Sequence, residues 1–191
     1  MQPDYPIETA RLRLRPFTRG DVDAVYGYRR RDDVARYLFD VPLSREECAL
    51  AVQQRIGQIA LEADEDKIIL GVELAEAGTL IGEVSLILRN LDARQGEVGW
   101  IFHPDYQGHG YATEAAVALL DLAFGQGDMH RVMARCDARN TSSAKLMERL
   151  GMRREAHFRE HALFKGEWDE EFVYAILEDE WPQKRYAHLA S

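Results

Sequence analysis

The sequence has few cysteines, no long apolar run and no excess of positive charge. Its two cysteines, Cys48 and Cys136, are too few for a disulfide framework and lack the C-x-x-C spacing of a metal or redox site. No uninterrupted apolar run approaches the roughly 20 residues that a membrane helix needs, and residues 1–6 lack the charged and apolar regions of a signal peptide. We therefore expect a cytoplasmic protein that makes no contact with a membrane.

The charge balance narrows the range of partners. The 191 residues include 33 acidic and 24 basic side chains, which give a formal net charge of −9. Such a chain has no global positive field to hold nucleic acid, so we expect small or cationic partners. Neither an internal repeat nor a Pro/Gly/Ser-rich linker divides the sequence. With 46% hydrophobic residues, the chain is expected to form a single domain over residues 1–191.

The hydrophobic periodicity predicts strands with helices between them. Leu12 and Leu14 alternate with arginines, as in a half-buried strand, and Ser44 with Glu47 forms a capping-box pattern before a helix. The predicted order is β-α-α-β-β-β-α-β-α-β-β, with strands at 8–16, 67–75, 79–88, 97–102, 131–137, around 158 and at 171–177, and with helices after 21, after 44, at 111–124 and at 142–150.

The most informative segment is the loop from His103 to Thr113, which precedes the Ala-rich helix. Gly108 and Gly110 bracket one residue, so the backbone can turn tightly there without interference from a Cβ atom. The amides that begin the helix have no intrahelical partners, and the helix dipole adds partial positive charge. A pyrophosphate could therefore bind largely to the main chain, even in an acidic protein.

Three readings compete for this loop on the local pattern alone. A Walker loop requires lysine and then serine or threonine after the glycine, but Tyr111 follows Gly110, which excludes it. A dinucleotide fingerprint requires a third glycine where Thr113 stands, and more parallel strand-helix units than this chain offers. An ordinary turn into a helix stays open at this level.

Four motifs in order resemble those of the GNAT superfamily of acetyltransferases. Residues 107–112, Gln-Gly-His-Gly-Tyr-Ala, match the family's Gln/Arg-x-x-Gly-x-Gly/Ala motif. Residues 8–15 and 110–115 resemble the branch related to ribosomal-protein N-terminal (alanine/serine) acetyltransferases, as do Asn140-x-x-Ser143 and Leu150-Gly-Met152. The resemblance covers roughly residues 7 to 180. It implies an α+β fold with a central, mostly antiparallel mixed sheet of six to seven strands and about four flanking helices, in which the fourth and fifth strands splay apart.

The resemblance also implies a reaction and its cosubstrate. Acetyl-coenzyme A (acetyl-CoA) would give its acetyl group directly to a primary amine, either a protein N-terminus or a small molecule, in a ternary complex without a metal. Members of the family can form homodimers. The residues expected at the cofactor are Trp100, Ile101, Phe102, Gln107, Gly108, His109, Gly110, Tyr111, Ala112, Thr113, Asn140, Ser143 and Lys145. His157 and His161 have the spacing of helical metal ligands but fall in a predicted strand, so we expect no metal site.

Direct transfer requires an unprotonated amine and a donor for the leaving thiolate. A carboxylate could take the proton, and the candidates are Glu83, Glu97 and Glu160, although each could instead simply face solvent. The ribosomal-protein branch uses a glutamate in the sixth strand, where this chain has Ala162. Met147 replaces the family's acid tyrosine, so Ser143 is the expected donor, unless it only caps its helix.

The segment after the first predicted helix could select the acceptor amine, and two functions other than acetyl transfer stay open. In similar proteins one helical region forms a wall of the acceptor site. Here that region contains the aromatic residues Tyr26, Tyr28, Tyr37 and Phe39 and the acids Asp32, Asp33 and Asp40. The same pattern is equally explained by a stripe of core residues beside a solvated helix face. A module that binds acyl-CoA without catalysis is the alternative if the three glutamates lie away from the thioester. A dinucleotide-binding enzyme is the less favoured alternative.

Overall fold

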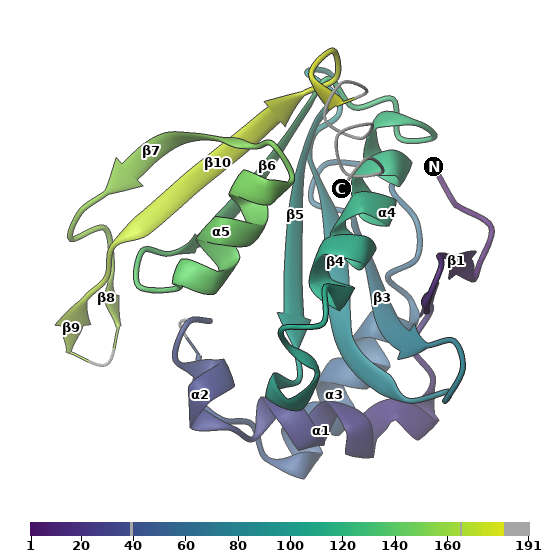
Figure 1. The fold of residues 1–191 in the computed structure, drawn as a ribbon. Helices are drawn as coiled ribbons and strands as arrows, with labels where there is room; N and C mark the ends of the chain where they lie inside the picture. The colour runs from purple at the N-terminus through teal and green to yellow at the C-terminus, as the bar shows by residue number, and fades with distance from the viewer. Residues whose placement is uncertain (39, 165, 182–191) are drawn as a thin grey trace.

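A central sheet organises the chain in this computed structural model, which describes residues 1–38, 40–164 and 166–181. Its strands are β1 (Ile7–Glu8), β2 (Leu12–Arg15), β3 (Lys67–Leu74), β4 (Leu80–Asn90), β5 (Gln95–Phe102), β6 (Arg131–Asp137), β7 (Arg153–Phe158) and β10 (Glu171–Leu177). They form one eight-stranded sheet in the order β1-β2-β3-β4-β5-β6-β10-β7 (Figure 1). The short strands β8 (Leu163–Phe164) and β9 (Glu167–Trp168) pair separately. The predicted mixed, mostly antiparallel fold is confirmed.

The sheet has one strand more than expected because the segment predicted as a single strand at 8–16 is a hairpin. β1 and β2 pair antiparallel, with Ile7 opposite Leu14. Thr9 closes the turn, since its amide donates to the carbonyl of Leu12 at 2.9 Å and the amide of Leu12 donates to its hydroxyl at 3.0 Å. The alternation in β2 is as predicted, because Leu12 and Leu14 are fully buried while the arginines after them are partly exposed.

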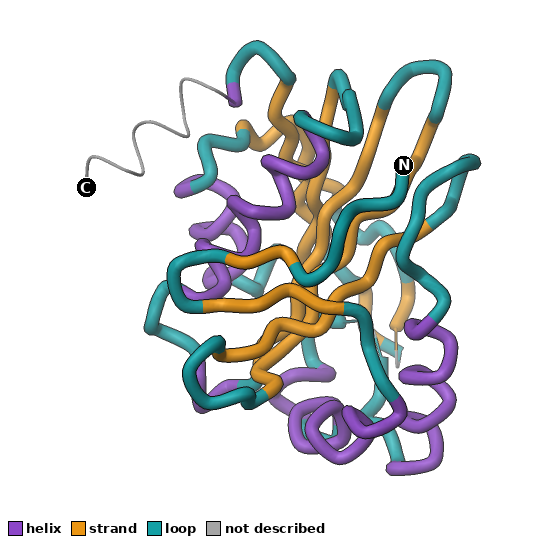
Figure 2. The backbone as a smooth tube through the Cα atoms, turned by 90° about the vertical axis from the view of Figure 1, so that its right-hand side faces the viewer, coloured by secondary structure: helices purple, strands orange, loops and turns teal. Residues whose placement is uncertain are grey.

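Helices cover both faces of the sheet (Figures 1 and 2). They are α1 (Val22–Arg29), α2 (Asp32–Ala35), α3 (Arg45–Ile56), α4 (Tyr111–Phe124) and α5 (Thr141–Arg149). Alternate residues of β3 divide between two cores: Ile68 and Leu70 pack with residues of α4, and Ile69 packs with residues of α1 and α3. The Ser44 capping box at α3 is present, and the four-residue α2 is the helix that the periodicity did not predict.

The sheet opens between β5 and β6, the one parallel pair among its described strands. The two strands pair only through residues 95–97 and 131–133. Beyond that point β6 continues to pair with β10 along residues 131–137, whereas β5 stays on β4. The sequence predicted that its fourth and fifth strands splay apart. These strands are β5 and β6, and the splay is confirmed. It leaves room between the end of β5, the start of α4 and α5.

Candidate functional site

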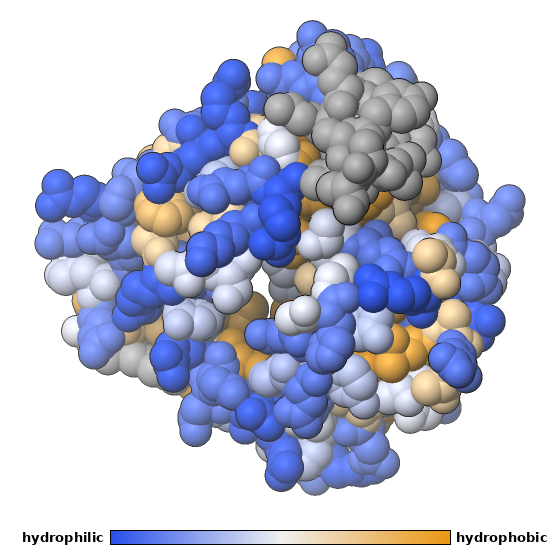
Figure 3. All heavy atoms as spheres, in the orientation of Figure 1, coloured by the Kyte–Doolittle hydropathy of each residue, from blue (hydrophilic) through white to orange (hydrophobic). Residues whose placement is uncertain are grey.

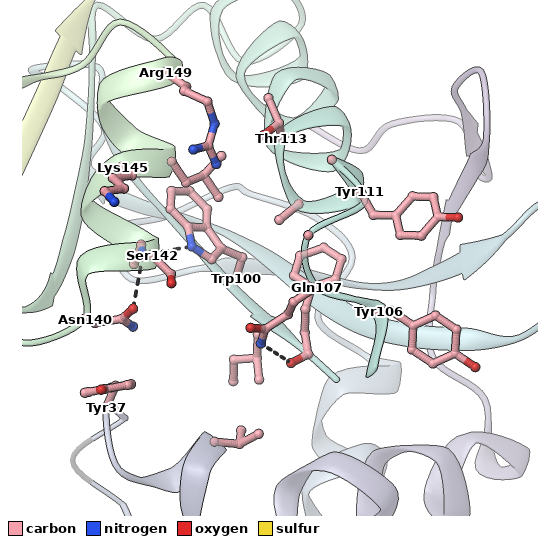
Figure 4. A pocket seen from close by; sticks show the side chains of 18 of the residues that line it. Tyr37, Trp100, Tyr106, Gln107, Tyr111, Thr113, Asn140, Ser142, Lys145 and Arg149 are labelled. Atoms are coloured by element: carbon pink, nitrogen blue, oxygen red, sulfur yellow. Dashed lines mark hydrogen bonds between the residues drawn. The ribbon is translucent and has the colours of Figure 1, made fainter. Parts of the chain in front are cut away.

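A cavity of about 560 Å³ lies at this opening. In the orientation of Figure 1, the molecular surface is hollowed near its middle (Figure 3). Figure 4 shows side chains from α4, α5, the end of β5 and the segment after α2 arranged around it. The residues that line it are Asp33, Val34, Tyr37, Leu38, Trp100, Ile101, Phe102, Tyr106, Gln107, Gly108, Gly110, Tyr111, Ala112, Thr113, Asn140, Ser142, Ser143, Lys145, Leu146 and Arg149. Every residue expected at the cofactor is in this set except His109.

A row of main-chain amides without acceptors forms one wall of the cavity. Gly108 and Gly110 have φ angles of 81° and 80°, values that side-chain-bearing residues rarely adopt. Gly110 is the N-cap of α4, and no side chain caps the helix. Within the part of the chain that the structure describes, no amide of residues 108–113 donates to another protein group. Together with the helix dipole, these donors make the start of α4 suited to an anion.

The turn between β1 and β2 braces this loop from outside the cavity. Arg11 Nε lies 2.7 Å from a carboxylate oxygen of Glu114 in the first turn of α4, and Arg11 Nη1 donates to the His109 carbonyl at 3.0 Å. Burial opposes ionisation of Glu114, but hydrogen bonds from Thr9 and Arg11 outweigh it and hold the pKa of Glu114 below its usual range. Arg11 therefore neutralises a carboxylate at the helix end where an anion would bind.

His109 and Gln107 fix the shape of the loop. The ring of His109 stacks on Tyr111 with centroids 5.7 Å apart, and its Nδ1 lies 2.9 Å from the carbonyl of Gln107. The side-chain amide of Gln107 donates to the carbonyl of Phe102 at 3.3 Å, which ties the loop to the end of β5. His109 thus packs against its neighbours and does not line the cavity.

The start of α5 forms the opposite wall. The side chain of Asn140 caps the helix by accepting from the amide of Ser143 at 3.1 Å. The Ser143 hydroxyl is therefore not the cap; its Oγ accepts a hydrogen bond from the indole of Trp100 at 3.2 Å. Burial raises the pKa of Cys136 to about 11, although a hydrogen bond from Ser143 acts in the opposite direction. At neutral pH this thiol stays protonated, as expected of a buried, unreactive cysteine.

Two free cations lie on the cavity side of α5. Lys145 and Arg149 are four residues apart, so they share one face of the helix. Neither has a hydrogen-bond or ion-pair partner among the described residues. Arg149 extends from α5 toward α4 (Figure 4). Arg149 is not among the residues predicted from the sequence, although its helical spacing from Lys145 is a signal that could have identified it.

The structure does not bring the three predicted base glutamates into the cavity. Glu83 is buried at 6% exposure, where it accepts from the Tyr28 hydroxyl at 2.9 Å and pairs with Arg55 at 2.8 Å. Glu160 is exposed in the bend after β7 with a φ of 49°. Neither residue lines the cavity.

Glu97 is also outside the cavity. It lies at the end of β5 that is still paired with β6, and not along the splayed part. Its carboxylate accepts from Arg89 at 2.9 Å and from Arg135 at 3.1 Å, so two guanidinium groups occupy it. A base must reach the proton directly or through one water, and Glu97 does not line the space where the thioester would bind.

Residues 33–38, which follow α1, contribute a third wall of the cavity. Of the predicted acceptor residues, Asp33 and Tyr37 line the cavity, whereas Tyr26, Tyr28, Asp32 and Asp40 do not, and Phe39 lies outside the described residues. Hydrogen bonds from Arg31 at 2.9 and 2.8 Å hold the pKa of Asp33 below its usual range. Val34 and Leu38, which the sequence did not single out, face the same space.

The described residues offer neither a metal-binding cluster nor a membrane-spanning helix. No group of three or more His, Cys, Asp or Glu side chains there is placed to hold a metal ion. No helix in residues 1–38, 40–164 and 166–181 is long and apolar enough to cross a membrane.

Comparison with known proteins identifies relatives along nearly the whole chain. A family model described as an acetyltransferase (GNAT) domain matches residues 11–153. The uncharacterized N-acetyltransferase YnaD of Bacillus subtilis (strain 168) is 35% identical over 175 residues, which cover 92% of this chain and 98% of that protein.

Two solved structures from Vibrio cholerae have the same fold. Spermidine N-acetyltransferase in complex with CoA and spermine is 26% identical with a TM-score of 0.77, over 91% of this chain and 99% of that chain. A candidate ribosomal-protein-serine acetyltransferase is 26% identical with a TM-score of 0.75, over 93% and 99%.

Proposed function

The chain belongs to the GNAT acetyltransferases, and on that premise we propose that it transfers the acetyl group of acetyl-CoA directly to a primary amine within one ternary complex. The observation that carries the proposal is the row of free amides at residues 108–113, which apart from His109 belong to residues that line the cavity together with Lys145 and Arg149. These groups fit a pyrophosphate and a further phosphate, because donors without partners and unpaired cations stabilise anions. Acetyl-CoA would supply the acetyl thioester in the space between β5 and α5.

We assign Ser143 to the leaving group. Its hydroxyl lines the cavity, and Asn140 already caps α5, so the helix does not require it. Because the indole of Trp100 donates to Ser143 Oγ, that bond does not use the hydroxyl hydrogen, which would turn from the Cys136 sulfur to the leaving thiolate. A hydroxyl at a helix start can donate to a developing thiolate, and the helix dipole favours the same negative charge.

We propose that water takes the proton from the bound acceptor, since Asp33 is the one acid among the described residues that line the cavity and Arg31 is bound to it. An α-amine has a pKa of about 7.7 to 8.0, so roughly a third of it is neutral at pH 7.5. A lysine-like amine with a pKa near 10.4 is neutral at only about one part in a thousand. Without a nearby base, an amine of low pKa is therefore acetylated faster.

The position of the glutamates also favours a second candidate, a module that binds acyl-CoA without catalysis. Glu83, Glu97 and Glu160 all lie outside the cavity, which is the arrangement expected of such a module. The family assignment makes the enzyme the better supported function. The dinucleotide alternative lacks support, because the described sheet has one parallel strand pair where a doubly wound fold has several.

A thermal-shift experiment with acetyl-CoA, CoA, NAD and ATP tests the cofactor, because a ligand that binds only the native state raises the melting temperature. We expect stabilisation by the two CoA species alone. Release of free thiol from acetyl-CoA in the presence of amines then separates the enzyme from the binding module. Stabilisation without thiol release from any amine would support the module.

A further inference from the structure

The two ends of the cavity have different chemistry. The end between α4 and α5 offers free amides and two cations, so it is suited to the anionic part of a ligand. The other end remains for the acceptor. Figure 4 shows Tyr37 across the cavity from Asn140 at this end. The side chains there are mostly apolar or aromatic: Val34, Tyr37, Leu38, Ile101 and Phe102.

Acidic side chains are scarce at the acceptor end. Among the described residues that line the cavity, Asp33 is the one acid, and its two oxygens accept from Arg31 at 2.9 and 2.8 Å. The charges of this pair cancel in large part. Asp33 can still accept a hydrogen bond from one ammonium group, but the described residues that line the cavity offer no second carboxylate for another.

The shortage of acidic side chains should make the cavity bind some amines better than others. A polyamine carries several positive charges, and each one that leaves water without a carboxylate partner destabilises the complex. An apolar body gains free energy when it is buried against Val34, Leu38 and Ile101. A single ammonium can also bind to the face of a tyrosine ring, and Tyr37 lines this end, where the Arg36 guanidinium lies 5.5 Å from its ring centroid.

On the basis of the proposed function, we infer that the acceptor is a primary amine with a single positive charge on an apolar body, and that polyamines are poor acceptors. The same chemistry occurs in a small arylalkylamine and in a peptide whose first residue is apolar.

The test compares 2-phenylethylamine, a tetrapeptide that begins with phenylalanine, and spermidine, all with acetyl-CoA and the full chain. We expect kcat/KM for at least one apolar amine to exceed that for spermidine about tenfold or more. The ratio of kcat/KM for 2-phenylethylamine to that for the peptide shows whether the acceptor is a small amine or a peptide N-terminus. Equal or faster acetylation of spermidine would overturn the inference. Thermal stabilisation by acetyl-CoA with no acetylation of either apolar amine would also overturn it and would leave the proposed cofactor intact. Absence of acetyl-CoA binding would overturn the proposed function together with this inference.

Adding a carboxylate to the apolar end of the cavity should improve spermidine as an acceptor. Leu38→Glu adds an acid to the apolar end, so the ratio of kcat/KM for spermidine to that for 2-phenylethylamine should rise about tenfold. Leu50→Glu is the matched control, because Leu50 is 67% exposed on α3 and does not line the cavity. It should leave the ratio unchanged. The acetyl-CoA thermal shift of each variant checks that it is folded. An unchanged ratio in folded Leu38→Glu would contradict the inference.

Discussion

The substitution Gly108→Ala tests the amide wall most directly. Gly108 has a φ of 81°, and an added Cβ would meet no protein atom within 4 Å, so the methyl group would project into open space beside the free amides. Alanine in the left-handed region costs about 1–2 kcal/mol. For a chain of this size that corresponds to a fall of roughly 2–8 °C in the melting temperature.

Gly78→Ala is the matched control. Gly78 has a φ of 64° and also has no atom within 4 Å of its added Cβ, but it does not line the cavity. Both variants should therefore lose similar stability without ligand, and only Gly108→Ala should lose ligand affinity. A methyl group that separates the pyrophosphate from even one amide removes a hydrogen bond to a charged group, worth about 1.5–3 kcal/mol. We therefore expect at least about tenfold weaker binding.

Differential scanning fluorimetry with acetyl-CoA measures both effects. At a ligand concentration of about 100 times Kd, the unmodified chain gains about 2.7 kcal/mol. A tenfold rise in Kd removes about 1.4 kcal/mol of this, so the ligand-induced shift should shrink by roughly 3–6 °C. Wild-type affinity in Gly108→Ala would refute the amide wall. Equal loss of affinity in Gly78→Ala would show that the effect is not local.

Three further predictions concern other parts of the site. Ser143→Ala should lower kcat about 10- to 100-fold with little change in KM for acetyl-CoA, and Trp100→Phe should lower kcat less; an unchanged kcat in Ser143→Ala would remove serine as the donor. Glu97→Gln should leave the pH dependence of kcat/KM unchanged, and a shifted profile would restore Glu97 as the base. The pKa of Glu114 is lowered, so its stabilising contribution is full above the unfolded pKa of about 4.5 and is lost as pH falls through the lower folded value. Melting temperatures of Glu114→Gln should thus fall below wild type by a constant amount near pH 7, and the gap should narrow progressively as pH falls below about 4.5; a gap that does not narrow in acid would contradict this linkage.

The sequence by itself determined the elements whose causes are local. The capping box of α3, the alternation of β2 and the glycine-bracketed start of α4 each depend on a few neighbouring residues. Main-chain amides at a helix start are free because of helix geometry, whatever the rest of the fold does. For that reason the sequence could predict where a helix start offers free amides, and 12 of the 13 residues expected at the cofactor line the cavity.

Tertiary structure decided which charged groups reach the cavity. Glu83 meets Tyr28 across 55 positions of sequence, and Glu97 meets Arg135 across 38, so neither pairing has a local signal. The brace between Arg11 and Glu114 spans 103 positions. A carboxylate is available for chemistry only if no nearby cation binds it, and those cations come from distant strands and helices. The sequence could therefore name acidic candidates, but only the packing of β4, β5 and β6 showed that they are held outside the cavity.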